Sequence, residues 1–320
     1  MKRHDVVIIG AGSAGLAARE EVAAATDRYL VIDPGPLGTT CARAGCMPSK
    51  ALVEVANAHH ASVKLREIGV LTESEPIDRA QVMTHVRALR DRFVGGVLES
   101  QKEWETEHLL NARAKILSEN LIEANGERIH ADKIIVAAGT RPIVPEAWKN
   151  SGARLETTDS FFELKDLPDQ IAVIGFGPVG LELSLALARL GVEVTVFGDA
   201  KNFGGLSDPE VIKAAKSALA TELTLVEGRV ESVRGAGDKT ELRVNDETHS
   251  TKMILLAMGR ESRFQELGLD RLPLKLDERG QPEIDPENFR LPGTEVYLVG
   301  DLNRKKPLLH EAVDQGRIAA

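Results

Sequence analysis

The stretch Val6-Val7-Ile8-Ile9-Gly10-Ala11-Gly12-Ser13-Ala14-Gly15 decides the fold of this 320-residue chain. A β-branched run typical of a buried strand leads into a glycine turn, and a stretch rich in Ala, Leu and Glu predicts a helix to about residue 25. Gly10, Gly12 and Gly15 have the spacing that lets a backbone approach a pyrophosphate at a helix N-terminus. Asp33 ends the next predicted strand, where a ribose-binding acid belongs. The pattern predicts a dinucleotide site, the alternative being a plain turn with a capping acid.

The same pattern occurs a second time. Gly175, Gly177 and Gly180 again lie between a predicted strand and a predicted helix. Two motifs predict two dinucleotide sites, for which one flavin and one nicotinamide are the natural pair. The next strand ends in Gly198 and Asp199, of which residue 198 is expected to face the adenine ribose. Neither residue is a base that would hold a 2′-phosphate, so the pattern favours NADH over NADPH.

Strands and helices alternate along the chain, which predicts an α/β fold of two Rossmann-like, three-layer nucleotide-binding domains. Residues 1–150 are expected to form a first nucleotide-binding part that carries the cysteines. Residues 151–262 are expected to form a second nucleotide-binding domain with the second glycine motif, and residues 263–320 a segment that returns the chain elsewhere. One buried face of a long helix is predicted from the spacing of Val82, Val86, Leu89, Phe93 and Val97.

Composition limits the classes of function. A hydrophobic fraction of 42% can fill two cores, and a formal net charge of −9 argues against a nucleic-acid or anionic-membrane partner. No apolar run is long enough to span a bilayer, and the first one is too short for a signal peptide, so the expected location is the cytoplasm. His59 and His60 have no second ligand cluster at metal spacing, so no metal site is predicted and a solvated helix face is expected.

The two cysteines lie in Gly38-Thr39-Thr40-Cys41-Ala42-Arg43-Ala44-Gly45-Cys46-Met47-Pro48-Ser49-Lys50. Two sulfurs five positions apart, on a helical turn and its continuation, can approach bonding distance without a large loop. A helix N-terminus with Arg43 and Lys50 nearby favours the thiolate, which is the form that exchanges with disulfides. Two small buried hydrophobic residues are the alternative interpretation.

This segment resembles the Gly-Gly-Thr-Cys-x-x-x-x-Gly-Cys-x-Pro-Ser-Lys signature of class I pyridine nucleotide-disulfide oxidoreductases such as dihydrolipoamide dehydrogenase, glutathione reductase and mercuric reductase. Only one glycine of the initial pair is missing, since Thr39 stands between Gly38 and Thr40. The chain also resembles the family at residues 138–142, 254–260 and 296–301. The resemblance implies an FAD-dependent enzyme that passes electrons between NAD(H), FAD and the cysteine pair. It also implies that residues 1–150 are the first part of an FAD-binding domain, residues 151–262 an inserted NAD(P)-binding domain, and residues 263–320 a return segment that completes the FAD-binding domain. Cys41 would be the exchanging thiol, and Cys46 the one that touches the flavin.

By the same resemblance, Lys50 pairs with Glu182 beside the flavin and the nicotinamide, and Asp301 binds the ribityl chain. A fixed cation there would stabilise charge arriving at the ring, and its carboxylate partner would orient it, whereas an ordinary ion pair is the alternative. The predicted catalytic residues are Cys41, Cys46, Lys50 and Glu182. The predicted cofactor-binding residues are Gly10, Gly12, Gly15, Asp33, Thr40, Lys50, Gly139, Asp301, Gly175, Gly177, Gly180, Asp199 and Gly259.

The sequence also departs from the family pattern. The family continues into a dimerisation domain that holds the catalytic base, a histidine oriented by a glutamate, and no residue here is expected to take that role. Arg43 stands where lipoamide and glutathione enzymes usually carry asparagine, so a small-molecule or protein disulfide stays open as substrate, and so does the family's homodimer. The alternative function is a flavin-binding core with at most NADH diaphorase or quinone reductase activity. A low-molecular-weight thioredoxin reductase would carry Cys-x-x-Cys in its nicotinamide domain instead.

Overall fold

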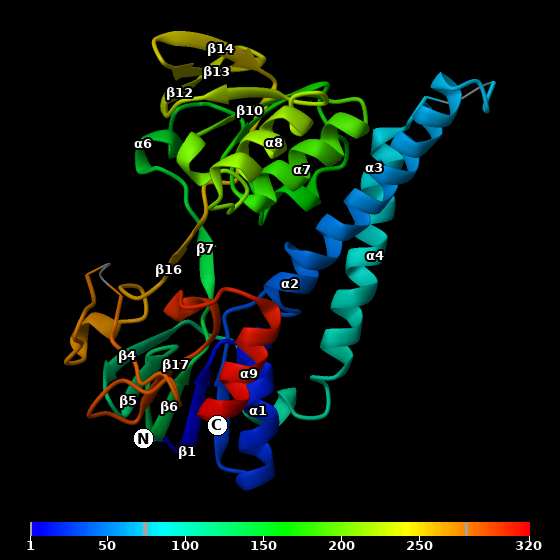
Figure 1. The fold of residues 1–320 in the computed structure, drawn as a ribbon. Coiled ribbons are helices and arrows are strands. Elements are labelled where there is room, and N and C mark those ends of the chain that lie inside the picture. Colours follow the sequence, from blue (N-terminus) through cyan, green and yellow to red (C-terminus); the bar gives the residue numbers. More distant parts are fainter. Residues whose placement is uncertain (1, 73–75, 279–280) are drawn as a thin grey trace. The chain divides into compact units, whose positions relative to one another are not determined.

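The computed structural model describes residues 2–72, 76–278 and 281–320, and the chain divides into two compact units (Figure 1). Unit 1 comprises Met1–Cys41, Phe93–Arg141 and Glu261–Ala320, and unit 2 comprises Ala42–Arg92 and Pro142–Arg260. The chain passes from one unit to the other at α2 (Thr40–Arg43), within α4 (Arg79–Glu99), and at the paired strands β7 (Thr140–Pro142) and β16 (Arg260–Ser262).

Unit 1 is built on a seven-stranded sheet. Its elements are β1 (Lys2–Ile9), α1 (Ser13–Ala25), β2 (Tyr29–Ile32), α5 (Glu105–His108), β3 (Leu109–Leu110), β4 (Ala114–Ser118), β5 (Leu121–Ala124), β6 (Glu127–Val136), η3 (Leu269–Arg271), β17 (Val296–Leu298), η4 (Gly300–Asn303) and α9 (Leu309–Ala319). The strand order is β3-β2-β1-β6-β5-β4, and β17 pairs with β6. Strands β1, β2, β3, β6 and β17 are parallel, while β4 and β5 add antiparallel pairs.

The side chains of β1 alternate between two cores, as expected for a strand buried on both faces. Val6 and Ile8 pack with α1 and α9, which run side by side along one face of the sheet (Figure 1). Val7 and Ile9 belong to the core of the opposite face, which includes Leu269 of η3. The β-branched run at the start of the chain therefore forms the centre of unit 1.

Unit 2 contains a five-stranded parallel sheet in the order β11-β10-β9-β15-β8. Its elements are α3 (Cys46–Glu67), α6 (Glu146–Lys149), β8 (Leu155–Thr157), η1 (Phe161–Glu163), β9 (Gln170–Ile174), α7 (Pro178–Arg189), β10 (Glu193–Gly198), η2 (Ala200–Asn202), α8 (Pro209–Leu219), β11 (Thr224–Glu227), β12 (Val230–Ala236), β13 (Lys239–Val244), β14 (Glu247–Thr251) and β15 (Met253–Leu256).

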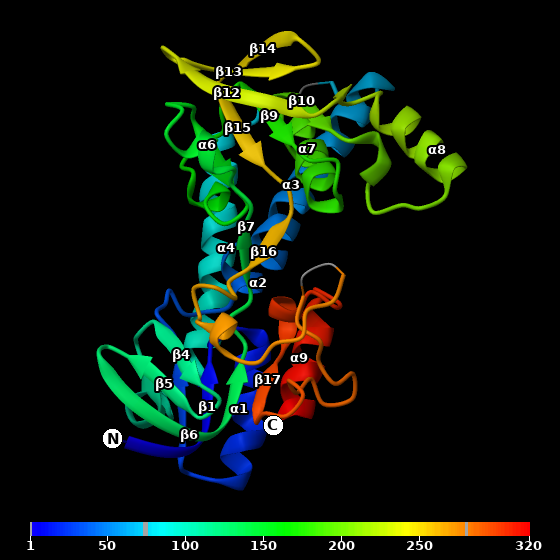
Figure 2. The same cartoon turned by 90° about the vertical axis from the view of Figure 1, so that its left-hand side faces the viewer.

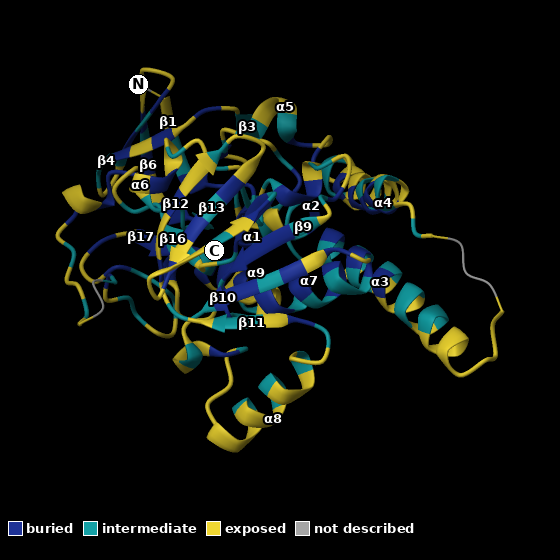
Figure 3. Cartoon of the chain, turned by 90° about the horizontal axis from the view of Figure 1, so that it is seen from above, coloured by how far each residue is buried: buried dark blue, intermediate teal, exposed yellow. Residues whose placement is uncertain are grey.

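Both faces of the unit 2 sheet are covered. The antiparallel sheet β12-β13-β14 packs Val233 and Leu242 against Ile174 and Ile254 on one face (Figure 2). Helices α3, α4 and α7 cover the other face, with Leu52, Val82 and Leu187 in a single core with Val173 of β9. Helix α8 has no buried residue and presents mainly exposed positions (Figure 3).

Helix α4 corrects one detail of the sequence analysis. Val82 and Val86 are buried as predicted, but Phe93 is 47% exposed. Arg90 and Val94 continue the buried face instead, each 6% exposed, because steps of four residues from Val86 lead to them. Arg90 lies on this face because its Nη1 donates to Oε1 of Glu163 at 2.6 Å.

The compact units are defined by packing, and they group residues 42–92 with residues 142–260. The assignment of residues 1–150 and 263–320 to an FAD-binding domain, and of residues 151–262 to a nicotinamide domain, stays a prediction. In the part of the chain that the structure describes, no helix has the length and apolar character needed to cross a bilayer.

Candidate nucleotide and redox sites

The first glycine turn joins β1 to α1 in unit 1. Gly10 has a φ of +109°, and a Cβ on it would lie 2.4 Å from the carbonyl oxygen of Ala137. A Cβ on Gly15 would lie 1.8 Å from the carbonyl oxygen of Gly10, so helix and turn can pack only through glycine. Gly12 differs, since a Cβ there would meet nothing within 4 Å. Open space therefore lies beside the first turn of α1, where an anion would be favoured.

Asp33 lies directly beside this turn. Its Oδ2 accepts a hydrogen bond from the amide of Ala11 at 2.7 Å, and its Oδ1 accepts one from the amide of Gly35 at 2.7 Å. A carboxylate has about four lone pairs, so both oxygens can still accept bonds from ribose hydroxyls. The structure thus fixes the orientation of the predicted acid.

The second glycine turn, between β9 and α7 of unit 2, repeats this geometry. Gly175 has a φ of +132°, and a Cβ added to it would lie 2.2 Å from the carbonyl oxygen of Ala257. A Cβ on Gly180 would lie 2.2 Å from the carbonyl oxygen of Gly175, while one on Gly177 would meet nothing within 4 Å. The chain therefore contains two turns with the same steric requirements and the same open position.

Asp199 is exposed just after β10, in the same unit as the second turn. Its carboxylate accepts a hydrogen bond from the amide of Lys201 at 2.9 Å and caps η2. The preceding residue, Gly198, accepts a hydrogen bond from the amide of Gly228 at 3.0 Å. The structure thus holds the carboxylate of Asp199 in a local turn at the surface.

The cysteines lie on two consecutive helical segments. Cys41 is in α2, which begins at Thr40, and Cys46 is the first residue of α3. Both side chains are half-buried. Gly45 precedes α3 and has no side chain to cap it, while the Cys46 carbonyl accepts a bond from the Ser49 hydroxyl at 3.1 Å. The sulfur of Cys46 therefore belongs to the first turn of a 22-residue helix, where the helix dipole favours negative charge.

Lys50 and Glu182 form an ion pair between α3 and α7. The structure brings together two residues that are 132 positions apart in the sequence, as the family resemblance implied. Their side chains are 64% and 33% exposed, so the pair contributes little to stability. The pair holds the ammonium group of Lys50, in the helix that begins at Cys46, beside the helix that follows the second glycine turn.

Two further glycines lie in turns that leave parallel strands. Gly139 follows β6 with a φ of +62°, and Gly259 follows β15 with a φ of +93°. Neither position is crowded by backbone, so the left-handed conformation alone favours glycine at both. The carbonyl of Gly259 accepts a hydrogen bond from the amide of Ile143 at 3.1 Å.

Asp301 lies in η4, which is held by residues that the sequence analysis missed. The buried side chain of Gln315 in α9 accepts hydrogen bonds from the amide of Gly300 at 2.9 Å and from Nδ2 of Asn303 at 2.8 Å. The first bond holds the backbone directly before Asp301, and the second ties the side chain at the end of η4 to α9. Gln315 and Asn303 each lie beside charged residues in the sequence, so no local pattern indicated that they are buried.

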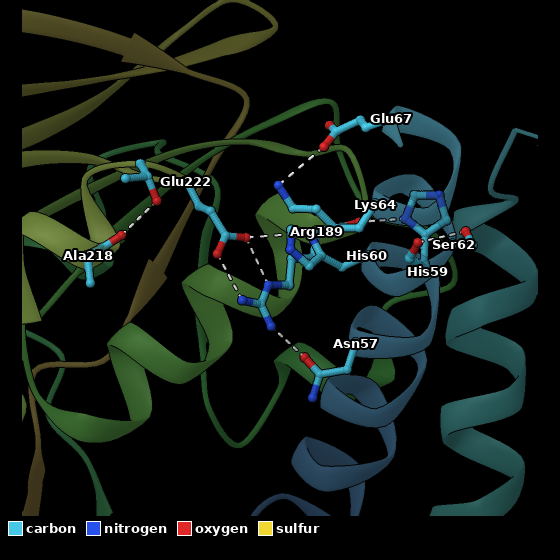
Figure 4. A network of polar contacts seen from close by, with 10 residues as sticks. Asn57, His59, His60, Ser62, Lys64, Glu67, Arg189, Ala218 and Glu222 are labelled. Atoms are coloured by element: carbon cyan, nitrogen blue, oxygen red, sulfur yellow. Dashed lines mark hydrogen bonds and ion pairs between the residues drawn. The ribbon is translucent and has the colours of Figure 1, made fainter. Parts of the chain in front are cut away.

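A polar network ties α3 to the end of α7 (Figure 4). Nδ1 of His59 donates to the carbonyl of Arg189 at 2.7 Å, and Arg189 donates to both carboxylate oxygens of Glu222 at 2.8 Å and to Asn57 at 2.6 Å. Nδ1 of His60 lies 3.7 Å from Oε2 of Glu222. The bonded Arg189 lowers the pKa of Glu222, and Glu222 raises that of Arg189.

The two histidines were predicted to lie on a solvated helix face, and these contacts correct that prediction. His59 caps the last turn of α7, which sequence spacing alone does not indicate. Among the described residues, no cluster of three or more His, Cys, Asp or Glu side chains could hold a metal ion.

Residues 4–316 match the pattern of the pyridine nucleotide-disulphide oxidoreductase family. The chain belongs to this family. The oxidoreductase is 27% identical over 327 residues to a dihydrolipoyl dehydrogenase of Staphylococcus aureus, covering 99% of the chain and 69% of that relative. It is 27% identical over 328 residues to a mercuric reductase of Bacillus cereus, covering 99% of the chain and 51% of that relative.

A solved structure gives the same fold. The oxidoreductase matches the Cu(II) complex of the HOCl-induced flavoprotein disulfide reductase RclA from Escherichia coli with a TM-score of 0.85 at 20% identity. The match covers 100% of this chain and 70% of that one. The α/β fold with Rossmann-type domains is thereby confirmed.

The comparisons also confirm the predicted family and the class of enzyme, a pyridine nucleotide-disulfide oxidoreductase that works with FAD. They do not favour the alternative of a flavin-binding core without disulfide turnover. The open positions at Gly12 and Gly177, each at the start of a helix, fit the pyrophosphates of two dinucleotides. The roles of the individual residues stay predictions.

Proposed function

We propose that this oxidoreductase is an NADH-dependent disulfide reductase of the dihydrolipoyl dehydrogenase type, with Cys41 and Cys46 as its redox-active pair. The ion pair between Lys50 and Glu182 carries the proposal, because it joins the helix that starts at Cys46 to the helix that starts at the second glycine turn. The net reaction converts NADH, a proton and a substrate disulfide into NAD⁺ and two thiols.

In this proposal FAD binds at the first glycine turn. The first-turn amides of α1 bind the pyrophosphate beside Gly12, and the carboxylate of Asp33 accepts bonds from the ribose hydroxyls. Asp301, Gly139 and Thr40 complete the predicted set. FAD, when bound, supplies the two-electron carrier between the nicotinamide and the cysteine pair.

The pyridine nucleotide binds at the second turn, with its pyrophosphate beside Gly177. Asp199 stands next to the expected position of the adenine ribose, where a carboxylate repels a 2′-phosphate. NADH is therefore proposed over NADPH, and flavin reduction followed at equal concentrations of each tests it. Faster reduction by NADPH at moderate salt, where simple repulsion is partly screened, would contradict this part.

The chemistry of the chain's own residues follows from position. The ammonium group of Lys50 stabilises negative charge that arrives at the reacting centre, and Glu182 holds it in place. Cys46, in the first turn of α3, is the thiolate that lies toward the cofactor, and Cys41 exchanges with the substrate. Arg43, between the two cysteines, would favour a substrate disulfide with a neighbouring anionic group.

The substrate class proposed is a small-molecule or protein disulfide, and the proposed location is the cytoplasm, where paired cysteines usually serve redox chemistry rather than structure. A homodimer is the assembly expected from the resemblance, and sedimentation of the purified protein measures it. Comparing lipoamide, glutathione disulfide and an oxidised protein as acceptors at fixed NADH identifies the substrate.

The decisive experiment separates the two thiols. Cys41→Ser leaves the sulfur at residue 46, so the oxidised, FAD-loaded protein is expected to show a long-wavelength shoulder that disappears on acidification. Cys46→Ser is expected to show none, and it serves as the matched control. A shoulder in Cys46→Ser instead would reverse the two roles, and its absence from both variants would remove the pair from the proposal.

A further inference from the structure

Phe176 and Gly198 meet beside the second glycine turn. Phe176 stands between Gly175 and Gly177, and Gly198 is the last residue of β10. A Cβ on Gly198 would lie 2.7 Å from Cγ and 3.0 Å from Cδ2 of the Phe176 ring, and 2.8 Å from the backbone nitrogen of Phe176. The backbone of Gly198 is outside the left-handed region, so any residue could adopt its conformation. Space, and not conformation, requires glycine at residue 198.

The ring of Phe176 is held in this position. It is 3% exposed and packs edge-to-face on Phe203, with 5.3 Å between ring centroids. The carbonyl of Phe176 accepts a hydrogen bond from the amide of Gly204 at 2.7 Å, which fixes the backbone beneath the ring. The ring therefore cannot move aside to admit a side chain at residue 198 without losing buried contacts.

The two glycine turns of the chain can be aligned by their hydrogen bonds. The amide of Gly10 donates to the carbonyl of Ile32, and the amide of Gly175 donates to the carbonyl of Phe197, at 2.8 Å in both cases. Residues 32 and 197 therefore correspond, and so do the residues that follow them.

Ala11 is consequently the counterpart of Phe176, and Asp33 is the counterpart of Gly198. In unit 1 the small residue leaves room for the acid, whose carboxylate accepts the amide hydrogen of Ala11 at 2.7 Å. In unit 2 the sizes are exchanged, because a large ring faces a glycine. Corresponding positions thus hold a carboxylate in one unit and a phenyl ring in the other, and in unit 2 the backbone nitrogen of Phe176 also lies only 2.8 Å from where a Cβ of residue 198 would be.

We propose that the ring of Phe176 fills the position of the ribose-binding carboxylate in the pyridine nucleotide site, so that this site lacks the acid that would select against a 2′-phosphate. This inference rests on the proposed function. Asp199 is then the residue that discriminates against a 2′-phosphate. Its carboxylate is exposed and already accepts a hydrogen bond from the amide of Lys201, and the positive charge of Lys201 lies two residues away, so its repulsion of a phosphate is weak. The preference of the unmutated chain for NAD⁺ over NADP⁺ is therefore only a few-fold.

The test rebuilds the arrangement of unit 1 in unit 2. Dissociation constants for NAD⁺ and NADP⁺ are measured by calorimetry on the FAD-loaded protein, and melting temperatures are recorded for the same samples. In F176A/G198D the ratio of the NADP⁺ constant to the NAD⁺ constant is expected to rise about tenfold or more, since a charged hydrogen-bonding group is gained. F176A alone should leave the ratio unchanged, and G198D alone should melt at a lower temperature.

Neutral variants isolate the steric part. G198A should lower the melting temperature, and adding F176A should restore part of that loss beyond the cost of F176A alone, since the contact with the ring is removed while the contact with the backbone nitrogen of residue 176 remains. The inference would be overturned if adding G198A lowered the melting temperature equally in the wild-type and F176A backgrounds. It would also be overturned if G198D raised the ratio of NADP⁺ to NAD⁺ dissociation constants without lowering the melting temperature. If F176A/G198D folds and binds NAD⁺ but its ratio of NADP⁺ to NAD⁺ dissociation constants is unchanged, this inference is overturned while the proposed function stands. Failure of the unmutated protein to bind either nucleotide would overturn the proposed function as well.

Discussion

At the scale of single residues, Gly12 and Gly15 of the first turn are required for different reasons: the first leaves space open for a ligand, and the second allows helix and turn to pack. Gly12→Val is expected to abolish flavin content with little change in folding, because its side chain enters open space where the pyrophosphate would lie. Gly15→Ala is expected to destabilise the fold itself, because its Cβ would lie 1.8 Å from the carbonyl oxygen of Gly10. Flavin absorbance per polypeptide and thermal melting separate the two effects. Full flavin content in Gly12→Val would reject the assigned site.

The ion pair of Lys50 allows a second prediction at this scale. Lys50→Gln and Glu182→Gln are each expected to slow flavin reduction by NADH, by about tenfold for the lysine, because a fixed charge near the reacting centre is lost. Thermal stability should change little, since the pair is largely exposed. Lys64→Gln, which breaks the exposed pair with Glu67 on the same helix, is the control. Equal reduction rates for Lys50→Gln and Lys64→Gln would show that the pair is only structural.

At the scale of secondary-structure elements, the network at the end of α7 makes stability depend on pH. Glu222→Gln is expected to cost ~1–2 kcal/mol at neutral pH, because a bidentate, charge-assisted pair with Arg189 is lost. The pKa of Glu222 is lowered in the folded chain, chiefly by its bond to Arg189. The carboxylate therefore stabilises the fold above its unfolded pKa, and this contribution disappears as the pH falls through the lower, folded value.

The measurement is thermal melting of both proteins from neutral to acid pH. The difference in melting temperature between wild type and Glu222→Gln should become smaller as the solution becomes acid. Glu227→Gln removes a more exposed pair with Lys216 and should change stability by at most about 0.5 kcal/mol, so it is the matched control. A gap that is independent of pH would mean that packing, and not charge, accounts for the loss.

Elements with a strict local rule could be predicted from the sequence. The glycine turns and their strands are such cases, because the motif constrains backbone and space together. The sheet β12-β13-β14 went unpredicted, although Thr240, Leu242 and Val244 alternate with polar residues. The buried Arg90 and the capping His59 could not be predicted, since each depends on a partner that is distant in sequence: Glu163 and Arg189.

At the scale of the whole chain, each unit has its own hydrophobic cores and its own glycine turn. The two nucleotides should therefore bind separately. Gly12→Val is expected to lose FAD but still bind NAD⁺, and Gly177→Val is expected to do the reverse. Calorimetry with each nucleotide measures both, and ligand-induced increases in melting temperature provide a second readout. Loss of both nucleotides from either variant, with the fold intact, would mean that the sites are coupled.

The open positions at Gly12 and Gly177 also matter for engineering. Random libraries at residues 10, 15, 175 and 180 would consist mostly of misfolded protein, since the backbone leaves no volume there. Residues 12 and 177 admit a side chain sterically, so a cysteine at either position offers an attachment point beside a helix N-terminus for a synthetic redox group. The same chain could thus be converted, one turn at a time, from a protein that binds natural dinucleotides into a scaffold for covalently tethered electron carriers.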